Sequence, residues 1–354
     1  MNIAAADLKH ALKRLAPIKT ETYQIGGAGV SAQDSDVLVS VVCPLSGLDG
    51  TFNISGKKLS QVVNRMSGQI EVTQADKKLI LKSAKARIEL EVQPTKPIPF
   101  PEDPTHSLSL DVSAFKKALA IASASASPAK SAAFGGVVMV QNLPLGLEET
   151  ESAGYRITGT DAVVLTTVTV REQVNLQFRA LLNLTASAIV QLMDGGNLVF
   201  GDTNKCLVLR SRDTTIYASK PVQKYPDFDA LMAKIPDIRV SIKPEELLSA
   251  LRTVEPLIDE TVDKGAVSLH FADGVVKCSN IGVGSTASDE ATYEQLEPDP
   301  VFDPREFTLK LTSKYLSGFL SKSGPDAVLG VTDKPIRLES GGVVVLTMPV
   351  GGTK

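Results

Sequence analysis

The chain has 354 residues, of which 43% are hydrophobic and 22% are charged, and its formal net charge is −3. This length accommodates two or three domains, and the composition is that of a soluble globular protein, which excludes the disordered and fibrous classes. The small negative charge excludes a surface that is basic everywhere, but it is compatible with a basic stripe on one face.

Residues 1–105 predict a first α+β domain. A helix-like segment at Leu8 opens it, and a second predicted helix occupies 56–66. Residues 86–92 alternate between apolar and charged side chains, which is the period-two pattern of a half-buried antiparallel strand. The proline-rich segment 94–101 predicts a rigid exit from the domain rather than a strand, because proline lacks the amide that a sheet ladder needs.

Residues 106–238 follow the same plan. A short strand at 108–110 precedes a predicted helix over 112–124, and a loop rich in proline, glycine and glutamate follows at 142–154. The β-branched run 163–170 then predicts a further strand.

Residues 239–354 contain the clearest hairpin of the chain. Two alternating segments flank Asp273-Gly274, a pair that favours positive φ in a tight turn. A final apolar strand is predicted at 343–349. With two helices and several antiparallel strands in each third, the predicted fold class is α+β, with the helices on one face of the sheet.

The similarity of the three thirds is the strongest signal in the sequence. In each third a helix-like segment carries an apolar residue followed three positions later by Ala-Leu. A repeat this long predicts tandem copies of one domain, at 1–105, 106–238 and 239–354. The three copies of the segment are Leu8/Ala11/Leu12, Phe115/Ala118/Leu119 and Leu247/Ala250/Leu251.

Catalytic and cofactor motifs are missing from the sequence. It has no GxxxxGK phosphate loop, and its three histidines, His10, His106 and His270, fall in three different predicted domains. A histidine general base or a metal site is therefore not expected. We expect a protein that is not an enzyme and that needs no cofactor and no metal.

The three cysteines, Cys43, Cys206 and Cys278, lie far apart without CxxC spacing. We expect buried reduced thiols, as in a protein of the reducing cytoplasm. The first residues lack the basic and apolar regions of a signal peptide, and no apolar run reaches the roughly 20 residues that span a bilayer. A cytoplasmic location without membrane contact is therefore the expectation.

Basic residues concentrate on the predicted helices, while the acids lie mainly on strands and late loops. A basic helix face is often only a solvated surface. Five of the six predicted helices share the bias, however, and only the one at 183–193 lacks a basic residue, which favours a common role. The residues concerned are Lys9, Lys13, Arg14, Lys57, Lys58, Arg65, Lys116, Lys117, Arg252 and Lys314.

Three short segments, in order along the repeat, resemble a known family. Residues 155–161 (Tyr-Arg-Ile-Thr-Gly-Thr-Asp), 219–228 (ending Tyr-Pro-Asp-Phe) and 345–350 (ending Met-Pro-Val) are similar to segments of the bacterial and phage DNA sliding clamp, the beta subunit of DNA polymerase III. The resemblance runs across nearly the whole chain.

The resemblance implies three domains of one fold per chain, and two chains that close head to tail into a ring around duplex DNA. The basic helix residues named above would face the opening and attract phosphates without reading bases. A homodimer contact would join Ile88 and Leu90 of one chain to Leu257 and Ile258 of the other.

The resemblance also implies a partner pocket that receives peptides of a DNA polymerase and a clamp loader. Its residues would be Phe134, Thr160, Leu165, Pro226, Leu231, Leu346, Met348, Pro349 and Val350. The sequence departs from the family where Gly-His-Arg is replaced by Ala162-Val163-Val164 and an arginine is replaced by Ala230, so a more apolar pocket is expected.

Two alternatives stay open at this level. A clamp-like protein could bind clamp partners without encircling DNA. A small-molecule enzyme on a repeated α+β scaffold would need a clustered polar pocket, and the sequence shows none.

Overall fold

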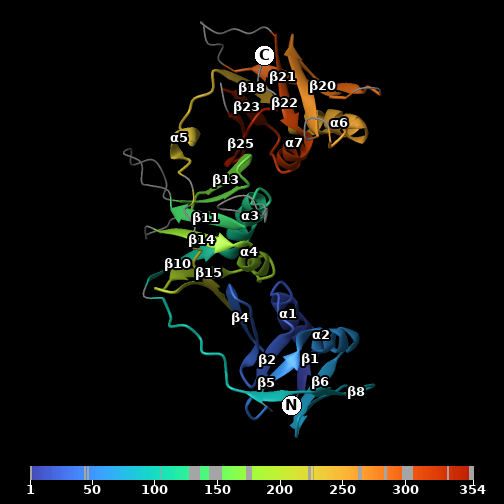
Figure 1. Ribbon diagram of the computed structural model, residues 1–354, viewed down its shortest axis with the longest axis vertical. Coiled ribbons are helices and arrows are strands. Elements are labelled where there is room, and N and C mark those ends of the chain that lie inside the picture. The colour runs from blue at the N-terminus through green and yellow to red at the C-terminus, as the bar shows by residue number, and fades with distance from the viewer. Residues whose placement is uncertain are drawn as a thin grey trace. The chain divides into compact units, whose positions relative to one another are not determined.

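The structure, a computed structural model (Figure 1), describes residues 2–350 apart from 44, 46–47, 105, 127–135, 143–153, 173–177, 222–224, 226, 262–264, 283–284, 297–305 and 333–334. The chain forms two compact units. Unit 1 comprises Met1–Ala120, Val137–Tyr155 and Arg171–Val222, and unit 2 comprises Ile121–Gly136, Arg156–Val170 and Gln223–Lys354. The architecture is mixed α+β, as the sequence predicts. Among the described residues no helix is long and apolar enough to cross a membrane.

Unit 1 contains two antiparallel sheets. The smaller has the order β1-β6-β7-β8, with bounds Asn2–Ala4, Gln69–Ala75, Lys78–Lys82 and Arg87–Glu91. The larger has the order β10-β15-β16-β17-β4-β3-β2-β5-β9. Its strands are β10 (His106–Asp111), β15 (Asn197–Asp202), β16 (Cys206–Ser211), β17 (Thr214–Ser219), β4 (Val37–Val42), β3 (Gly29–Gln33), β2 (Thr22–Gly26), β5 (Thr51–Ser55) and β9 (Gln93–Thr95). A further antiparallel pair joins β11 (Val137–Asn142) to β14 (Arg179–Asn183).

Three of the helices in unit 1 begin with side-chain caps, one of them at Asp111, whose carboxylate accepts from the amide of Ala114 at 2.7 Å. The helices are α1 (Ala5–Leu15), α2 (Gly56–Arg65), α3 (Val112–Ser123, whose end lies in unit 2) and α4 (Leu184–Val190). The Ser55 hydroxyl accepts from the amide of Lys58 at α2, and the Asn183 side chain accepts from the amide of Ala186 at α4, which satisfies donors that the first helical turn leaves open. Helices α1 and α2 pack against each other (Figure 1).

Unit 2 runs its strands in the order β12-β13-β25-β24-β23-β18-β21-β20-β19-β22. Their bounds are β12 (Tyr155–Thr160), β13 (Val164–Val170), β25 (Val343–Thr347), β24 (Ile336–Ser340), β23 (Ala327–Val331), β18 (Ile238–Ile242), β21 (Ser288–Gln295), β20 (Val275–Asn280), β19 (Ala266–Ala272) and β22 (Glu306–Thr312). Its helices are α5 (Asp229–Met232), α6 (Pro244–Val254), the short 3-10 turn η1 (Glu255–Leu257) and α7 (Ser313–Leu320).

One order of elements recurs three times along the chain: strand, helix, four strands, helix, three strands. It runs from β1 to β8, from β10 to β17 and from β18 to β25, with β9, α5 and η1 as additions. The two compact units divide the chain differently from these repeats. The reason is that strands of the middle repeat belong to both units.

Neighbouring repeats are joined by pairing of strand edges. In unit 1 the strand β4 pairs with β17, and in unit 2 the strand β13 pairs with β25. In both cases the fourth strand of one repeat pairs with the last strand of the next repeat. We call each such pairing a joint. A joint is made by backbone hydrogen bonds and therefore depends on register.

The local predictions have mixed outcomes. The Asp273-Gly274 hairpin is confirmed, because φ is 49° at Asp273 and 78° at Gly274 between β19 and β20. All three cysteines are buried and unpaired. The expectation that 94–101 contains no strand is wrong at its start, since Pro94 lies in β9 and pairs with Phe52. Strand β9 is the edge strand of its sheet, so the missing amide of Pro94 leaves no carbonyl of a neighbouring strand without a hydrogen bond.

Candidate functional site

Most basic residues predicted on the helices are exposed. Lys9 and Lys116 are half-buried, and on α1 and α2 a surface depression is lined by Lys9, His10 and Lys13 together with Ser60 and Asn64. Such amines can reach a phosphate backbone without reading bases. The exposed members are Lys13, Lys57, Lys58, Arg65, Lys117, Arg252 and Lys314.

Arg14 is the exception, and its assignment to a DNA surface is wrong. Its side chain is 1% exposed, and it donates to Asp213 at 2.6 Å and to Asp194 at 2.6 Å. It also donates to the carbonyl of Leu192 at 3.3 Å and lies 2.7 Å from the His10 ring nitrogen. A buried guanidinium that is committed to two carboxylates is not available to a phosphate.

The Arg14 cluster has a structural role within unit 1. Arg14 lies on α1 of the first repeat, whereas Asp194 and Asp213 lie in the second repeat, beside the joint of β4 with β17. Burial raises the pKa of the Asp194 carboxyl, but the charges of Arg14 and His10 outweigh it, so this pKa is lowered overall. The cluster therefore ties the two repeats together through a charged pair as well as through strand pairing.

Replacing Arg14 with methionine should lower the free energy of unfolding by about 2 kcal/mol, because it removes the charged hydrogen bonds from Arg14 on α1 to the partly exposed carboxylates of Asp194 and Asp213. Lys13→Met is the matched control, since Lys13 is exposed on the same helix. Equal losses in chemical denaturation of the two variants would show that Arg14 does not hold the repeats together.

Lys116 is also engaged within the chain. Its amine donates to the carbonyl of Met193 at 2.6 Å, and the Gln191 side chain donates to the Lys116 carbonyl at 2.9 Å. These bonds tie α3 to the end of α4. The neighbouring Lys117 is exposed and is the better candidate for a phosphate contact.

The predicted partner-pocket residues divide into a buried group and an exposed group, all in unit 2. Thr160, Leu165 and Leu346 are 2–5% exposed, and Leu165 is paired with Leu346 across β13 and β25. They are core residues that support the surface. Phe134 and Pro226 lie outside the described residues.

The exposed group lies on the turn before β13, directly after β25 and on α5. Met348 is 44% exposed, Val163 42% and Leu231 38%, and the amide of Met348 donates to the carbonyl of Val163. Pro349 and Val350 beside them are half-buried. We call Val163, Leu231 and Met348 the apolar patch.

Helix α5, which carries Leu231, is fastened to the sheet by two arginines. Arg156 of β12 forms an ion pair with Asp229, and Arg337 of β24 donates to the carbonyl of Met232. Because β12 and β24 flank the β13–β25 pair, α5 is held at the strands that carry the rest of the apolar patch.

The turn that presents Val163 is organised by Asp161. Its carboxylate accepts from the amides of Val163 and Val164 at 3.0 and 2.8 Å and from the hydroxyl of Tyr315 at 2.8 Å. Ala162 between them has φ of 76°, a conformation that favours glycine and costs a non-glycine residue free energy. Burial and the bond to Asp161 raise the pKa of Tyr315 to about 12, so this donor stays protonated at neutral pH.

The predicted dimer residues lie on two strand edges. Leu90 is 9% exposed and packs in the core of its own sheet. Ile88 and Ile258 are half-buried, and Leu257 is 40% exposed. Strand β8, which carries Ile88, is the edge of its sheet in the described structure.

Metal-ligating side chains do not gather in the part of the chain that the structure describes. Within the described ranges no group of three or more His, Cys, Asp or Glu residues could hold a metal ion.

Comparison with known proteins supports the fold directly. No family model and no curated protein matches the chain. A DNA polymerase III beta subunit from Thermotoga maritima superposes with a TM-score of 0.85 at 13% identity, over 99% of this chain and 98% of that one. A putative DNA polymerase III beta subunit from Eubacterium rectale gives 0.84 at 15% identity, over 99% of both chains. The Helicobacter pylori beta clamp bound to a DNA ligase peptide gives 0.79 at 17% identity, over 99% of this chain and 100% of that one. The chain therefore has the fold of the bacterial DNA sliding clamp along its whole length.

Proposed function

We propose that this protein is a DNA sliding clamp, a non-enzymatic processivity factor whose two copies form a closed ring around duplex DNA. The three repeats, 1–105, 106–238 and 239–354, act as its domains. The observation that carries the proposal is the pattern of joints. Two joints are made inside the chain, while β8 of the first repeat and part of β21 of the third are left at sheet edges in the described structure. Head-to-tail pairing of these edges in two copies gives a closed assembly.

The basic helix residues supply the attraction to DNA in this proposal. Contacts from lysine and arginine to phosphates are independent of sequence and allow sliding. The proposed contacts are Lys9, Lys13, Lys57, Lys58, Arg65, Lys117, Arg252 and Lys314, without Arg14 and with Lys116 only in a supporting position.

The apolar patch is the proposed docking place for a polymerase or a clamp-loader peptide. The Helicobacter pylori clamp of the same fold is bound to a DNA ligase peptide, which supports peptide recognition by this fold. Val163 stands where the resemblance expects a basic side chain, so a peptide with apolar anchors is favoured. With unpaired thiols in the chain, we propose that the ring works in the cytoplasm.

A clamp-like protein that binds the same partners without encircling DNA is the second candidate. It is favoured by one observation, the low overall charge of the chain. The two candidates differ in topology, so an experiment on the form of the DNA separates them.

The ring should stay on nicked circular duplex DNA at a salt concentration that removes simple electrostatic binding, because a closed ring is retained topologically. Linearising the DNA should release it. Gel filtration of loaded complexes before and after cutting measures this retention. Equal retention on circular and linear DNA, or none on either, would exclude an encircling clamp.

Lys117→Ala should weaken binding to duplex DNA of any sequence. It should also reduce the slope of log K against log salt by about 0.9 for each phosphate that the variant no longer neutralises. Lys205→Ala is the control, because Lys205 is exposed on the β15–β16 turn rather than on a helix. Titration of labelled duplex at several salt concentrations gives the slopes. Identical slopes for both variants and the unmodified protein would remove Lys117 from the DNA surface.

Val163→Asp should abolish stimulation of a cognate polymerase while ring assembly is unchanged, because a charge in the apolar patch disfavours an apolar anchor. Val42→Asp is a control, since Val42 is 63% exposed at the end of β4 in unit 1. Primer extension and solution mass are measured together. Full stimulation by the Val163 variant would show that partners dock elsewhere.

A further inference from the structure

The two joints inside the chain each contain an equivalent backbone hydrogen bond. In the first, the amide of Val42, the last residue of β4, donates to the carbonyl of Asp213 at 2.7 Å. In the second, the amide of Thr169 near the end of β13 donates to the carbonyl of Gly342 at 2.9 Å. Each carbonyl belongs to the residue just before the incoming strand. This bond marks the register of a joint.

The corresponding donor in the third repeat is Thr292. Val42 pairs with Gly29, the first residue of β3, and Thr292 pairs with Val275, the first residue of β20. The amide of Tyr293 points to β20, where it bonds to Gly274. Because amides alternate along a strand, those of Thr292 and Glu290 point to the other side of β21. Strand β18 pairs on this side only with Tyr293–Gln295.

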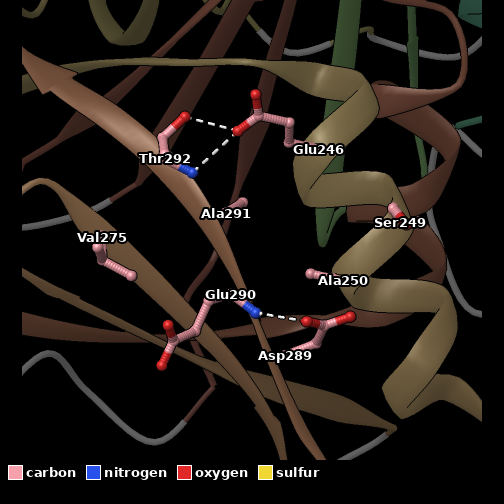
Figure 2. Close-up of a pocket in the computed structure, with 8 residues that line it drawn as sticks. All are labelled: Glu246, Ser249, Ala250, Val275, Asp289, Glu290, Ala291 and Thr292. Carbon is pink, nitrogen blue, oxygen red and sulfur yellow. Dashed lines mark hydrogen bonds between the residues drawn. The ribbon is translucent and has the colours of Figure 1, made fainter.

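Carboxylates occupy this edge (Figure 2). Glu246, in the first turn of α6, accepts from the Thr292 amide at 3.1 Å and from the Thr292 hydroxyl at 2.5 Å. The Glu290 amide donates to Asp289 at 2.9 Å. The hydrogen bonds from Thr292 lower the pKa of the Glu246 carboxyl, so it is ionised at neutral pH. In the third repeat a side chain therefore takes the place that the next repeat's carbonyl takes in the other two.

In the first repeat, the carbonyl that corresponds to those of Asp213 and Gly342 lies just before β8. A two-residue turn precedes the last strand in each repeat. In the second and third repeats Ser211 pairs with Thr214 and Ser340 pairs with Val343 across this turn. In the first repeat the Ser83 amide donates to the carbonyl of Ala86 at 2.8 Å. The second residue of these turns is Asp213, Gly342 and Lys85, respectively. The carbonyl of Lys85 is thus the counterpart of the two joint carbonyls.

The register of the two internal joints also predicts which residues of β8 and β21 would lie opposite each other. Thr215, two residues after Asp213, pairs with Ser40, two residues before Val42. The second joint has the same spacing, with Val344 paired to Thr167. Applied to β8 and β21, the spacing sets Arg87 opposite Glu290, an ion pair of opposite charges across the strands.

We propose that β21 of one copy and β8 of a second copy pair in this register, with Arg87 facing Glu290, and that the carbonyl of Lys85 displaces the Glu246 carboxylate from the Thr292 amide. The inference rests on the proposed ring and specifies its contact. The Glu246 carboxylate occupies an edge amide that could otherwise bond to an added strand, and we call this contact the guard of the open edge. The guard and the incoming strand compete for one donor, so the guard weakens ring closure.

The register is tested by exchanging charges in the full chain. Arg87→Glu and Glu290→Arg should each raise the dimer Kd about fivefold, and the double variant should restore it to within about twofold, because the closed ring holds two such cross-strand charge pairs and each contributes roughly 0.5 kcal/mol. Arg87→Glu with Glu294→Arg is the control. Glu294 is exposed but lies opposite Ser241 of β18, so it should not rescue. Sedimentation equilibrium measures each Kd.

The guard is tested by Glu246→Ala, which should lower the dimer Kd about fivefold by freeing the Thr292 amide. Glu245→Ala, exposed in the same helical turn, should leave the Kd unchanged. Hydrogen exchange at the Thr292 amide in dilute, monomeric protein should speed up in the Glu246 variant only, which reports the guard without assembly.

The outcomes separate the inference from the ring itself. A dimer of the unmodified chain with no rescue by the exchanged pair overturns the register, and an unchanged or raised Kd for Glu246→Ala overturns the guard, while the ring stands in both cases. If the unmodified protein and every variant stay monomeric at all concentrations, the ring and the inference are overturned together.

Discussion

Backbone pairing between strand edges of successive repeats is the interaction on which this structure depends. The second and third repeats each end in a strand that completes the sheet of the repeat before, as β17 does for β4 and β25 does for β13. Such pairing satisfies a whole row of amides and carbonyls at once, and an edge left open is a site for addition of another strand. A chain built from joints of this kind always has two edges to spare, one in its first repeat and one in its last.

Side chains reinforce or guard these edges according to their position. At the first joint the buried Arg14 side chain forms ion pairs with the partly exposed Asp194 and Asp213, which strengthens that connection. At the second, Asp161 and Tyr315 bond on the turn that leads into β13. At the open edge of β21 the carboxylate of Glu246 occupies the amide instead. A ring that must open to admit DNA benefits from strong joints inside each chain and a weaker one between chains.

The sequence predicts the repeat, the fold class and the clearest local elements, because these follow from short-range patterns. The Asp273-Gly274 turn and the alternation at 86–92 are signals of this kind. It does not predict that Arg14 is buried in ion pairs, since the partners of this residue lie 180 and 199 positions away in the chain. The role of Glu246 is hidden for a related reason: a glutamate in a first helical turn is ordinarily explained by the helix dipole.

A disulfide across the proposed contact tests the central claim most directly. Arg87→Cys and Glu290→Cys in one chain place cysteines on facing positions of β8 and β21, within reach of a disulfide, while the three native thiols are buried. We expect mild oxidation to give a covalent species of twice the chain mass that stays on circular DNA in denaturant and leaves when the DNA is cut. Monomers that do not cross-link, or a ladder of open oligomers, would contradict a closed ring of two chains.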